Sequence, residues 1–502
     1  MKLGELLAIF PEYRLGRVDM DASVRSLVFD SRHVRPDSVF IAIRGERADG
    51  HGFLQEACRR KPLALVVESD KSVPVEFSGA VVCVPSGRRA LAELSARFYS
   101  YPSKELFCVG VTGTNGKTSV TYMVEHILNF CGRPTGVLGT IDHHFNQRSW
   151  PGELTTPDPI KLQSRLKDFA QLGAKACALE VSSHALSQGR VDAVDFDVAV
   201  FTNLTRDHLD YHQTMEDYFL AKQRLFLEVL NSSSKKATWA IVNLDDPYGQ
   251  RLEICGSSQV WTYGQKNADL EFSVIRTDFF ATEFLIKTPR GERQARVPVP
   301  GLHSVYNATA AIGVALSAGI SLDIAVEALN EFLGVPGRLQ RVHLPQKVQD
   351  DLGLNIFVDY AHTDDALRSV LGALRQIRKQ TGHLGRIVTL FGCGGDRDQG
   401  KRPLMTRAAT ELSDLVWVTS DNPRTEDPQK IIDDCLAQLE PELLNKQVFT
   451  EVDRGKAIHQ VLSGAQRGDI ILIAGKGHED YQIIGQTRYP FSDQQVVKEF
   501  YR

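Results

Sequence analysis

The sequence predicts an α/β protein built from parallel sheets that carry polar side chains at the carboxyl ends of their strands. A chain of 502 residues suggests about three domains at roughly 150 residues each. Short apolar runs recur along the chain, and most of them end in a polar segment, as strands of an open parallel sheet do. One run, residues 106–111, leads through a glycine-rich turn into a helical pattern. These three observations predict the fold class.

Composition excludes several classes of protein. Apolar residues make up 42% of the chain, which is ordinary for globular domains. The net charge is −4 and no basic block occurs, so we expect no nucleic-acid partner. No run of about 18 apolar residues exists, and the first ten residues do not resemble a signal peptide. The eight cysteines form no C-x-x-C pair, which favours a reducing cytoplasm over disulfides or structural zinc. We expect a cytoplasmic monomer without a membrane partner.

Residues 1–103 are predicted to form the first domain. Residues 39–43 and 64–67 have the apolar character of buried strands. Between them, the polar and glycine-rich residues 44–52 could form a loop site for a polar ligand together with residues 30–32. A solvated loop is the alternative, because loops are polar by default.

The glycine-rich turn opens a second domain, predicted over residues 104–337. It follows the strand 106–111 and precedes a helix with apolar residues at positions 120, 123, 124, 127 and 128. Such a turn points backbone N–H groups and the positive end of the helix dipole at an anion. The strict P-loop has a glycine where Val111 stands. We interpret the turn as an ATP site, with an ordinary strand–helix turn as the alternative. Its residues are Gly113, Thr114, Asn115, Gly116, Lys117, Thr118 and Ser119.

Within this turn, Lys117 is expected to reach the terminal phosphates and the Thr118 hydroxyl to bind Mg²⁺. Mg²⁺ usually takes one or two carboxylates besides phosphates and water. Glu180, at the tip of the predicted strand 176–181, is the best second ligand, and His208 is a third candidate. The spacing of His208 and His212 could mimic a zinc pair, but the chain has no H-E-x-x-H motif.

Two further residues of this domain have both a chemical and a structural interpretation. Lys222 lies among apolar residues on a predicted helix. It is either a surface lysine or a buried amine that takes up CO₂ to give an anionic carbamate ligand. Asn307 opens an alanine-rich helix and could bind a nucleotide, or it could cap the helix.

Residues 338–502 are predicted to form a third domain with a second α/β sheet. Its apolar runs 356–358, 387–391, 415–418 and 470–473 lead to polar tips at residues 359–362, 392–397, 421–424 and 475–479. The carboxyl ends of parallel strands meet at one edge, so we expect a second polar crest there.

The motifs GTNGKT, EVSSHAL, TNLTRDHLDYH, HSVYNATAA, DYAH, FGCGGDRD, DNPR and GKGHE stand in the order found in the Mur ligase family, and the chain resembles that family along nearly its whole length. The closest resemblance is to members that add the third residue of the peptidoglycan stem peptide. It implies a UDP-sugar-binding domain, a central P-loop ATPase domain and a C-terminal Rossmann-like domain for the incoming amino acid. It also implies ATP and Mg²⁺ as cofactors and UDP-N-acetylmuramoyl-L-alanyl-D-glutamate as acceptor, with a role in cell wall synthesis, cell shape and division.

The resemblance also implies residue roles. The catalytic and metal-site residues would be Lys117, Thr118, Glu180, His208 and a carbamylated Lys222. ATP would also contact Asn307, Arg338 and Asp359. The UDP end of the acceptor would contact Phe29, Ser31, Glu46, Arg47 and Ala48, and its peptidyl end Thr155, Thr156, Ser182, Gln188 and Arg190. The amino acid would contact Arg397, Asp421, Asn422, Pro423, Arg424, Gly475 and Glu479.

Three alternatives remain at this point. The Asp421–Arg424 run resembles that of members that add meso-diaminopimelate, because a guanidinium can hold the second carboxylate of this amino acid. L-lysine-adding relatives usually lack the arginine. A folylpolyglutamate synthetase shares the fold and chemistry but would not need the D-N-P-R run. A nucleotide-switched regulator would carry a base-reading N/T-K-x-D motif, which the chain lacks.

Overall fold

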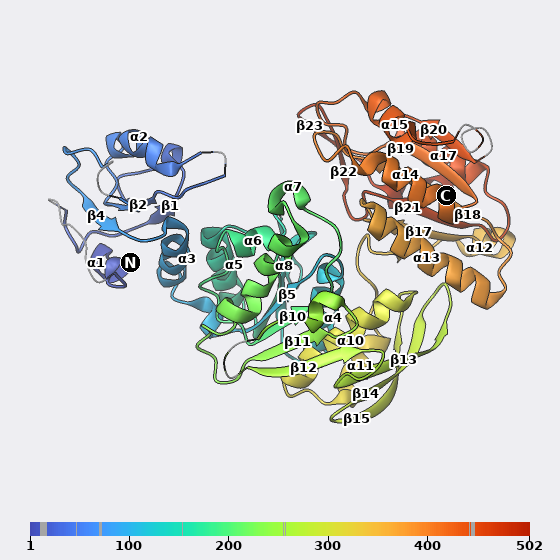
Figure 1. The fold of residues 1–502 in the computed structure, drawn as a ribbon, viewed down its shortest axis with the longest axis horizontal. Coiled ribbons are helices and arrows are strands. Elements are labelled where there is room, and N and C mark those ends of the chain that lie inside the picture. The colour runs from blue at the N-terminus through green and yellow to red at the C-terminus, as the bar shows by residue number, and fades with distance from the viewer. Residues whose placement is uncertain are drawn as a thin grey trace.

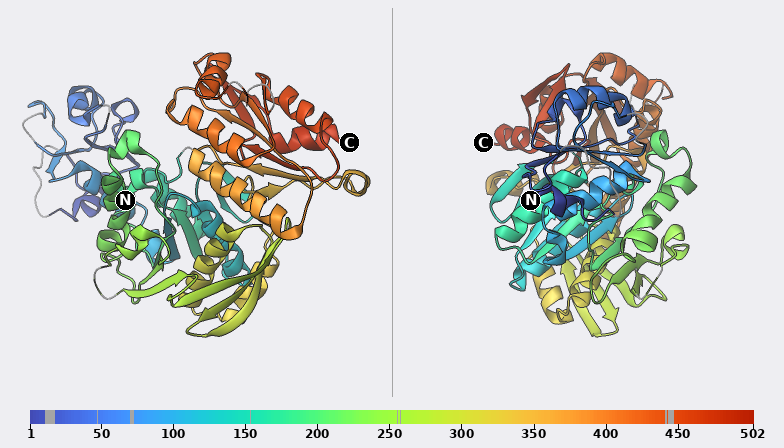
Figure 2. Two further views of the ribbon diagram at one scale, coloured as in Figure 1. Left: turned by 45° about the vertical axis from the view of Figure 1, so that its right-hand side comes forward. Right: turned by 90° about the vertical axis from the view of Figure 1, so that its left-hand side faces the viewer.

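The computed structural model describes residues 1–10, 18–46, 48–69, 73–152, 154–254, 256, 258–440, 442 and 447–502. They form three lobes, and each lobe is built on its own sheet (Figure 1). The lobes follow one another along the chain, and the left view of Figure 2 shows the blue first lobe and the orange and red third lobe on either side of the central one.

The first lobe is a four-stranded parallel sheet in the order β1-β2-β3-β4. Every residue of β2 and β3 is buried, which explains the continuous apolar runs from which the sequence predicts strands there. The elements are α1 (Leu3–Leu7), β1 (Ser26–Val28), β2 (Ser38–Ile41), α2 (Leu54–Arg59), β3 (Ala64–Val67), β4 (Ala80–Cys83) and α3 (Gly87–Phe98), with short 3₁₀ turns at Ser31–His33, Gly50–Phe53 and Pro102–Lys104.

The central lobe contains an eleven-stranded mixed sheet in the order β15-β14-β13-β12-β11-β10-β5-β9-β6-β7-β8. Its middle strands are parallel, as the sequence predicts, and both faces are covered by helices. The parallel strands are β5 (Phe107–Thr112), β6 (Thr135–Leu138), β9 (Ala176–Glu180), β10 (Val198–Phe201), β11 (Trp239–Asn243) and β12 (Gln259–Gly264).

Antiparallel strands extend this sheet at both edges, and the sequence analysis did not find them. Several of their residues are exposed on both faces, so no clean apolar run marks them. They are β7 (Asp142–Phe145) and β8 (Arg148–Pro151) at one edge, and β13 (Leu270–Thr277), β14 (Thr282–Thr288) and β15 (Gly291–Val297) at the other.

Helix α4 (Lys117–Phe130) begins at the glycine-rich turn, and its apolar face (Val120, Met123, Val124, Ile127 and Leu128) is buried as predicted. Helix α10 (Leu302–Ser317) packs against α4 in one core. The remaining helices are α5 (Pro159–Gln171), α6 (Ser183–Ser187), α7 (Leu209–His212), α8 (Met215–Arg224) with a π-helical turn at Leu225–Val229, α9 (Pro247–Gln250) and α11 (Leu322–Asn330).

The third lobe has a six-stranded sheet in the order β16-β17-β21-β18-β19-β20, parallel except for β16. Its strands are β16 (Gln340–Arg341), β17 (Asn355–Asp359), β18 (Ile387–Cys393), β19 (Leu415–Ser420), β20 (Val448–Glu451) and β21 (Ile470–Ala474). Its helices are α12 (Gln346–Leu352), α13 (Asp364–Thr381), α14 (Lys401–Leu412), α15 (Pro428–Leu436), α17 (Arg454–Ser463) and α18 (Asp493–Phe500). A separate hairpin joins β22 (Tyr481–Ile484) to β23 (Thr487–Pro490).

The four strands predicted in this lobe are confirmed as β17, β18, β19 and β21, and their tips lie at one edge of the sheet. Among the described residues, no helix combines the length and the apolar character needed to cross a membrane.

Candidate active site

The glycine-rich turn connects β5 to α4 in a conformation that only glycine permits. Gly113 has φ +149° and Gly116 has φ +87°. A Cβ on Gly113 would lie 1.8 Å from the Thr202 hydroxyl, and one on Gly116 would lie 2.5 Å from the Asn307 side-chain oxygen. The two glycines therefore allow the tip of β10 and helix α10 to approach the turn, and Asn307 lies next to Gly116.

Two lysine amines share one backbone carbonyl at this turn. Lys117 Nζ donates to Gly113 O and Thr114 O, both at 2.8 Å, and Lys222 Nζ donates to Gly113 O at 2.9 Å. Lys222 is 1% exposed, which excludes the surface-lysine interpretation. Burial lowers the pKa of both amines, and the charge of Lys117 lowers that of Lys222 further. A phosphate would neutralise this pair of amines, and carbamylation would instead turn Lys222 itself into an anion next to Lys117.

The predicted metal ligands lie around the same turn. Glu180, at the end of β9, is 1% exposed, and its carboxylate accepts hydrogen bonds from the amide and hydroxyl of Thr140 at 2.9 and 3.0 Å. The negative charge of Glu180 opposes the lowering of the Lys117 pKa by burial. The Thr118 hydroxyl accepts a hydrogen bond from Arg338 at 3.1 Å.

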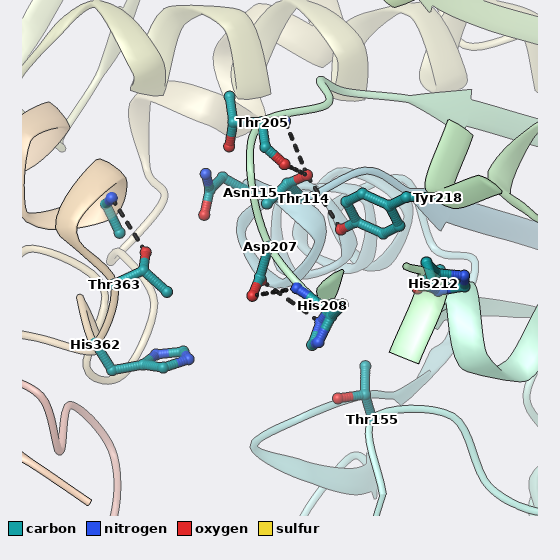
Figure 3. A network of polar contacts seen from close by, with 12 residues as sticks. Thr114, Asn115, Thr155, Thr205, Asp207, His208, His212, Tyr218, His362 and Thr363 are labelled. Carbon is teal, nitrogen blue, oxygen red and sulfur yellow. Dashed lines mark hydrogen bonds and ion pairs between the residues drawn. The ribbon is translucent and has the colours of Figure 1, made fainter. Parts of the chain in front are cut away.

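His208 has its backbone in the left-handed region, with φ +55°. Figure 3 shows its side chain next to Asp207. Its Nε2 lies 3.5 Å from Asp207 Oδ2. Partial burial lowers the pKa of His208 to about 4, and the nearby charges of Lys117 and Lys222 add to that effect while Asp207 opposes it. The imidazole is therefore neutral at pH 7 and has a lone pair to offer.

His212 packs among neighbouring polar and aromatic side chains. It is 6% exposed, its Nε2 lies 2.9 Å from the Ser183 hydroxyl, and its ring stacks on Tyr218 with centroids 5.1 Å apart. Tyr218 in turn contacts the Thr114 hydroxyl at 3.1 Å, as Figure 3 shows. His212 thus supports the glycine-rich turn through packing.

The donor set fits a nucleotide-bound Mg²⁺. Within the described ranges, no three His, Cys, Asp or Glu side chains are grouped so that they could hold a metal by themselves. Mg²⁺ in phosphate-binding sites needs only one or two protein oxygens, because phosphates and water complete its shell. The Thr118 hydroxyl and the Glu180 carboxylate are oxygen donors of this kind.

One of the two nucleotide candidates of the third lobe, Arg338, reaches this site. Besides its bond to Thr118, the Arg338 guanidinium lies over the Tyr360 ring, 4.6 Å from the centroid. Asp359, 7% exposed, accepts hydrogen bonds from the backbone amides of Leu339 and Ala361. Burial raises the pKa of Asp359, while the charge of Arg338 opposes that shift.

The five residues predicted for the peptidyl end of the acceptor form a connected group next to Glu180. Thr156 donates from its hydroxyl to Glu180 O at 2.7 Å and accepts from the Ser182 amide at 3.0 Å. Arg190 donates to Thr156 O at 2.7 Å and to the Gln188 side-chain oxygen at 2.8 Å. The Thr155 and Thr140 hydroxyls are 3.1 Å apart.

The residues predicted for the UDP end are more scattered. Glu46 reaches the central lobe, where it accepts a hydrogen bond from Gln188 at 2.5 Å. Phe29 packs against the core of the first lobe, and Ser31 donates to Glu56 at 2.7 Å. Ala48 lies on the same loop as Glu46 and accepts a backbone hydrogen bond from Gly45. Arg47 lies outside the described residues.

The predicted amino-acid site lies on the crest of the third lobe. Asn422 donates to Glu479 Oε2 at 2.8 Å, and Arg424 donates to Gly395 O at 2.8 Å. A Cβ on Gly394 would lie 3.0 Å from the Arg424 guanidinium and 3.8 Å from the Arg397 side chain, so these two arginines flank one glycine. The fold thus gathers Arg397, Asp421, Asn422, Pro423, Arg424, Gly475 and Glu479 along neighbouring strand tips.

The sequence analysis missed three residues of the site. Thr140 holds both Glu180 oxygens, and Lys476 lies among the residues predicted to bind the amino acid. Asp365 contacts Thr205 and, at 3.4 Å, the side-chain amide of Asn115 in the glycine-rich turn. Thr140 lies outside the motifs quoted above. Asp365 carries no local signal either, because an acid in the first turn of a helix is common. Lys476 stands inside the GKGHE motif, which could have drawn attention to it.

Comparison with known proteins agrees with this geometry. The Mur ligase middle domain matches residues 111–315, and the Mur ligase glutamate ligase domain matches residues 337–477. A UDP-N-acetylmuramoyl-L-alanyl-D-glutamate–2,6-diaminopimelate ligase of Geobacter sulfurreducens is 41% identical over 97% of this chain and 96% of its own length. The enzyme of the same name from Aquifex aeolicus is 42% identical over 95% and 93%. A solved structure of a ligase of that name covers 100% of this chain and 99% of its own, with 32% identity and a TM-score of 0.70.

The resemblance inferred from the ordered motifs is therefore confirmed. On both the family matches and the full-length relatives, this chain belongs to the Mur ligase family.

Proposed function

We propose that this chain is an ATP-dependent acid–amino-acid ligase that joins meso-diaminopimelate to UDP-N-acetylmuramoyl-L-alanyl-D-glutamate in peptidoglycan precursor synthesis. The single observation that carries the proposal is the contact between Thr156 and Glu180. Through this contact, the residues predicted to hold the acceptor lie directly beside those predicted to hold the phosphates and Mg²⁺. An enzyme that phosphorylates a carboxylate needs this adjacency, because the acceptor oxygen must lie in line with the terminal phosphate of ATP. The names of the full-length relatives supply the substrates.

The reaction follows from the weakness of a carboxylate as an electrophile. The acceptor carboxylate takes the terminal phosphoryl group of ATP, ADP leaves, and the acyl phosphate has a good leaving group. The amine of the second substrate then attacks the carbonyl carbon, loses a proton, and the tetrahedral intermediate releases phosphate as the amide forms. The protein contributes mainly positioning and charge neutralisation.

The proposal assigns a role to each residue at and around the glycine-rich turn. Lys117 would leave the two loop carbonyls to neutralise the transferring phosphoryl group, and Thr118, Glu180 and His208 would hold Mg²⁺. When bound, Mg²⁺ would offset the charge of the phosphates. Lys222 would serve as a carbamate, because its buried amine has the depressed pKa that favours reaction with CO₂.

The ATP, acceptor and amino-acid contacts named above are part of the proposal, as are domain boundaries at residues 1–103, 104–337 and 338–502. Asn307, Arg338 and Asp359 would contact the nucleotide from two lobes. Arg424 would hold the distal carboxylate of diaminopimelate and Glu479 its distal ammonium. Because the acceptor is nucleotide-linked and the reaction uses ATP, the proposal includes a cytoplasmic location.

A phosphate-release assay tests the function. The chain would be incubated with Mg²⁺–ATP, and the acceptor and amino acid would be added singly and together, over a panel of amino acids and over folate as a rival acceptor. We expect steady release only with UDP-N-acetylmuramoyl-L-alanyl-D-glutamate and meso-diaminopimelate together. Release that depends on folate and glutamate, or that needs neither partner, would contradict the proposal.

A further inference from the structure

Lys476 is a fully buried lysine on the crest of the third lobe. Its side chain is 0% exposed, and its Nζ lies 3.3 Å from Asp421 Oδ1, 3.2 Å from Asn422 Oδ1 and 3.1 Å from Glu479 Oε2. A buried charge is tolerated only when it is paired and hydrogen-bonded. Lys476 therefore ties the tip of β19 to the loop that follows β21, and these are the two segments proposed to hold the amino acid.

The backbone of the β19 tip is fixed by another element, the β22–β23 hairpin. Ile483 N donates to Asn422 Oδ1 at 2.9 Å, and Gln482 donates from its side chain to Asp421 O at 2.6 Å. Arg424 N donates to Ile483 O at 3.1 Å, and Gly485 N donates to Arg424 O at 2.7 Å. Because the hairpin already holds the backbone of the β19 tip, the main effect of Lys476 is on the charge and orientation of the Asp421 and Glu479 carboxylates.

Glu479 is the carboxylate closer to the Lys476 ammonium, at 3.1 Å compared with 3.3 Å for Asp421. Burial raises the pKa of Glu479, and the negative charge of Asp421 raises it further, while Lys476 and the hydrogen bond from Asn422 oppose both effects. Arg454 on α17 also acts on this region, but Asp493 pairs with it at 2.7 and 2.8 Å.

The other titratable groups that act on Glu479 are the phenols of Tyr360 and Tyr481, and burial raises the pKa of both above the usual range. They are uncharged at neutral pH. Lys476 is thus the cation in direct contact with Glu479 that opposes the rise of the Glu479 pKa.

Resting on the proposed function, we infer that Lys476 is a positioning residue that keeps Glu479 ionised and turned so that Glu479 Oε1 receives the distal ammonium of the incoming amino acid. Glu479 Oε2 is occupied by Lys476 and Asn422. In the described part of the chain, Oε1 accepts no hydrogen bond. Asp421, Glu479 and Lys476 together leave one negative charge, which matches one ammonium group.

The test compares the wild type with Lys476→Met, and with Lys498→Met as a control for losing an exposed lysine of the same lobe. The KM for meso-diaminopimelate, the KM for ATP and kcat would be measured at pH 7.0 and 8.5. We expect Lys476→Met to raise the amino-acid KM about tenfold at pH 7.0 and only about threefold at pH 8.5, with kcat and the ATP KM within about twofold. The recovery follows because Glu479 without Lys476 regains its charge only at higher pH. The control should match the wild type.

An equal rise of KM at both pH values would mean that Lys476 acts through packing alone and would overturn the inference. A double-mutant cycle checks this independently. In a Glu479→Gln background no carboxylate remains to be kept ionised, so adding Lys476→Met should change KM by less than about twofold. A further tenfold rise in that background would also contradict the inference.

Two outcomes separate this inference from the proposed function. If the wild type does not turn over diaminopimelate, the proposed function fails. If the wild type does so and Lys476→Met has the wild-type KM, only the inference fails. Should Lys476→Met not fold, Lys476→Arg keeps the charge, and a folded Arg variant with a KM within about threefold of the wild type at pH 7.0 supports a charge role, whereas a tenfold rise opposes it.

Discussion

Asp365 of helix α13 accepts a hydrogen bond from the Thr205 hydroxyl, 2.8 Å away across the boundary between the third and central lobes. The same carboxylate oxygen lies 3.4 Å from the side-chain amide of Asn115 in the phosphate loop. A negative charge of the third lobe therefore lies directly at the loop proposed to bind a polyanion.

Asp365→Asn should tighten ATP binding. The substitution keeps the shape of the side chain and its contact with Thr205, but removes the repulsion between the carboxylate and the phosphates. We expect the KM for ATP to fall about threefold at low ionic strength, with a smaller effect in 0.5 M salt because salt screens the charge. Asp364→Asn, one residue earlier on the same helical turn, is the matched control and should leave the KM unchanged. A higher ATP KM in Asp365→Asn would show instead that the carboxylate assists nucleotide binding.

Lys222→Ala should remove most of the activity. The residue is buried and its amine shares the Gly113 carbonyl with Lys117, so the variant loses the proposed carbamate at the metal site. Turnover should return in part when a short carboxylate such as acetate is added, because it can occupy the vacated space. Lys235→Ala, which removes a mostly buried lysine paired with Asp197 at 3.1 Å, should show no such rescue. Wild-type turnover by Lys222→Ala in CO₂-depleted buffer would exclude the carbamate.

Lys117→Ala should abolish turnover and leave the free energy of unfolding within about 1 kcal/mol of the wild type. The Lys117 amine donates only to two carbonyls of its own loop, and burial lowers its pKa. It therefore contributes little to the free energy of unfolding. Thr118→Val should raise the Mg²⁺ concentration needed for half-maximal activity, whereas Thr118→Ser, which keeps the hydroxyl, should not. A large loss of stability with near-normal turnover would favour a structural turn over a phosphate site.

Arg424 should select meso-diaminopimelate over L-lysine. The substrates differ by one carboxylate, and a site built around a charged partner can reject an analogue that lacks it by roughly 10⁴-fold. Arg424→Ala should raise the KM for diaminopimelate at least about tenfold, or 1.4 kcal/mol. Arg488→Ala, which removes an arginine that lies over the Tyr481 ring in the same lobe, should have little effect. Equal turnover of the two amino acids by the wild type would refute this selectivity and leave the ligase assignment intact.

His144 should make stability fall at alkaline pH. Burial alone would lower its pKa, but hydrogen bonds to Asp142 at 2.7 Å and Glu125 at 3.1 Å outweigh burial and raise the pKa to about 10. The folded pKa lies above the unfolded value of about 6.5, so the contribution is complete below pH 6.5 and is lost as pH rises towards 10. Relative to His144→Gln, the wild type should lose on the order of 5 kcal/mol of unfolding free energy over that range.

The neighbouring His143 provides a control with the opposite sign. Burial, followed by the charge of Arg165, lowers the pKa of His143 to about 4. His143→Gln should therefore gain stability relative to the wild type as pH falls from 6.5 to 4. Urea unfolding at pH 5, 7 and 9 would measure both variants. A pH-independent difference between the wild type and His144→Gln would contradict the ion-pair account.

The sequence by itself determined the features that depend on neighbouring residues. The strand–turn–helix at the glycine-rich turn, the buried runs of β9, β18 and β21 and the polar tips after them all follow from periodicity and turn chemistry over a few residues. Ordered motifs then identified the family. Strands β13 and β15 escaped prediction, because four consecutive residues of each are exposed and no period-2 apolar pattern marks them.

Only the tertiary structure decided which distant side chains meet. Arg338 reaches Thr118 from 220 residues away, Asp365 reaches Thr205 from 160, and Lys476 joins Asp421 from 55. Nothing in the local sequence of Asp365 separates it from an ordinary acid at a helix start. Such contacts depend on how whole sheets and lobes pack, and a sum of many weak apolar contacts sets that packing, so no single segment of the sequence specifies it.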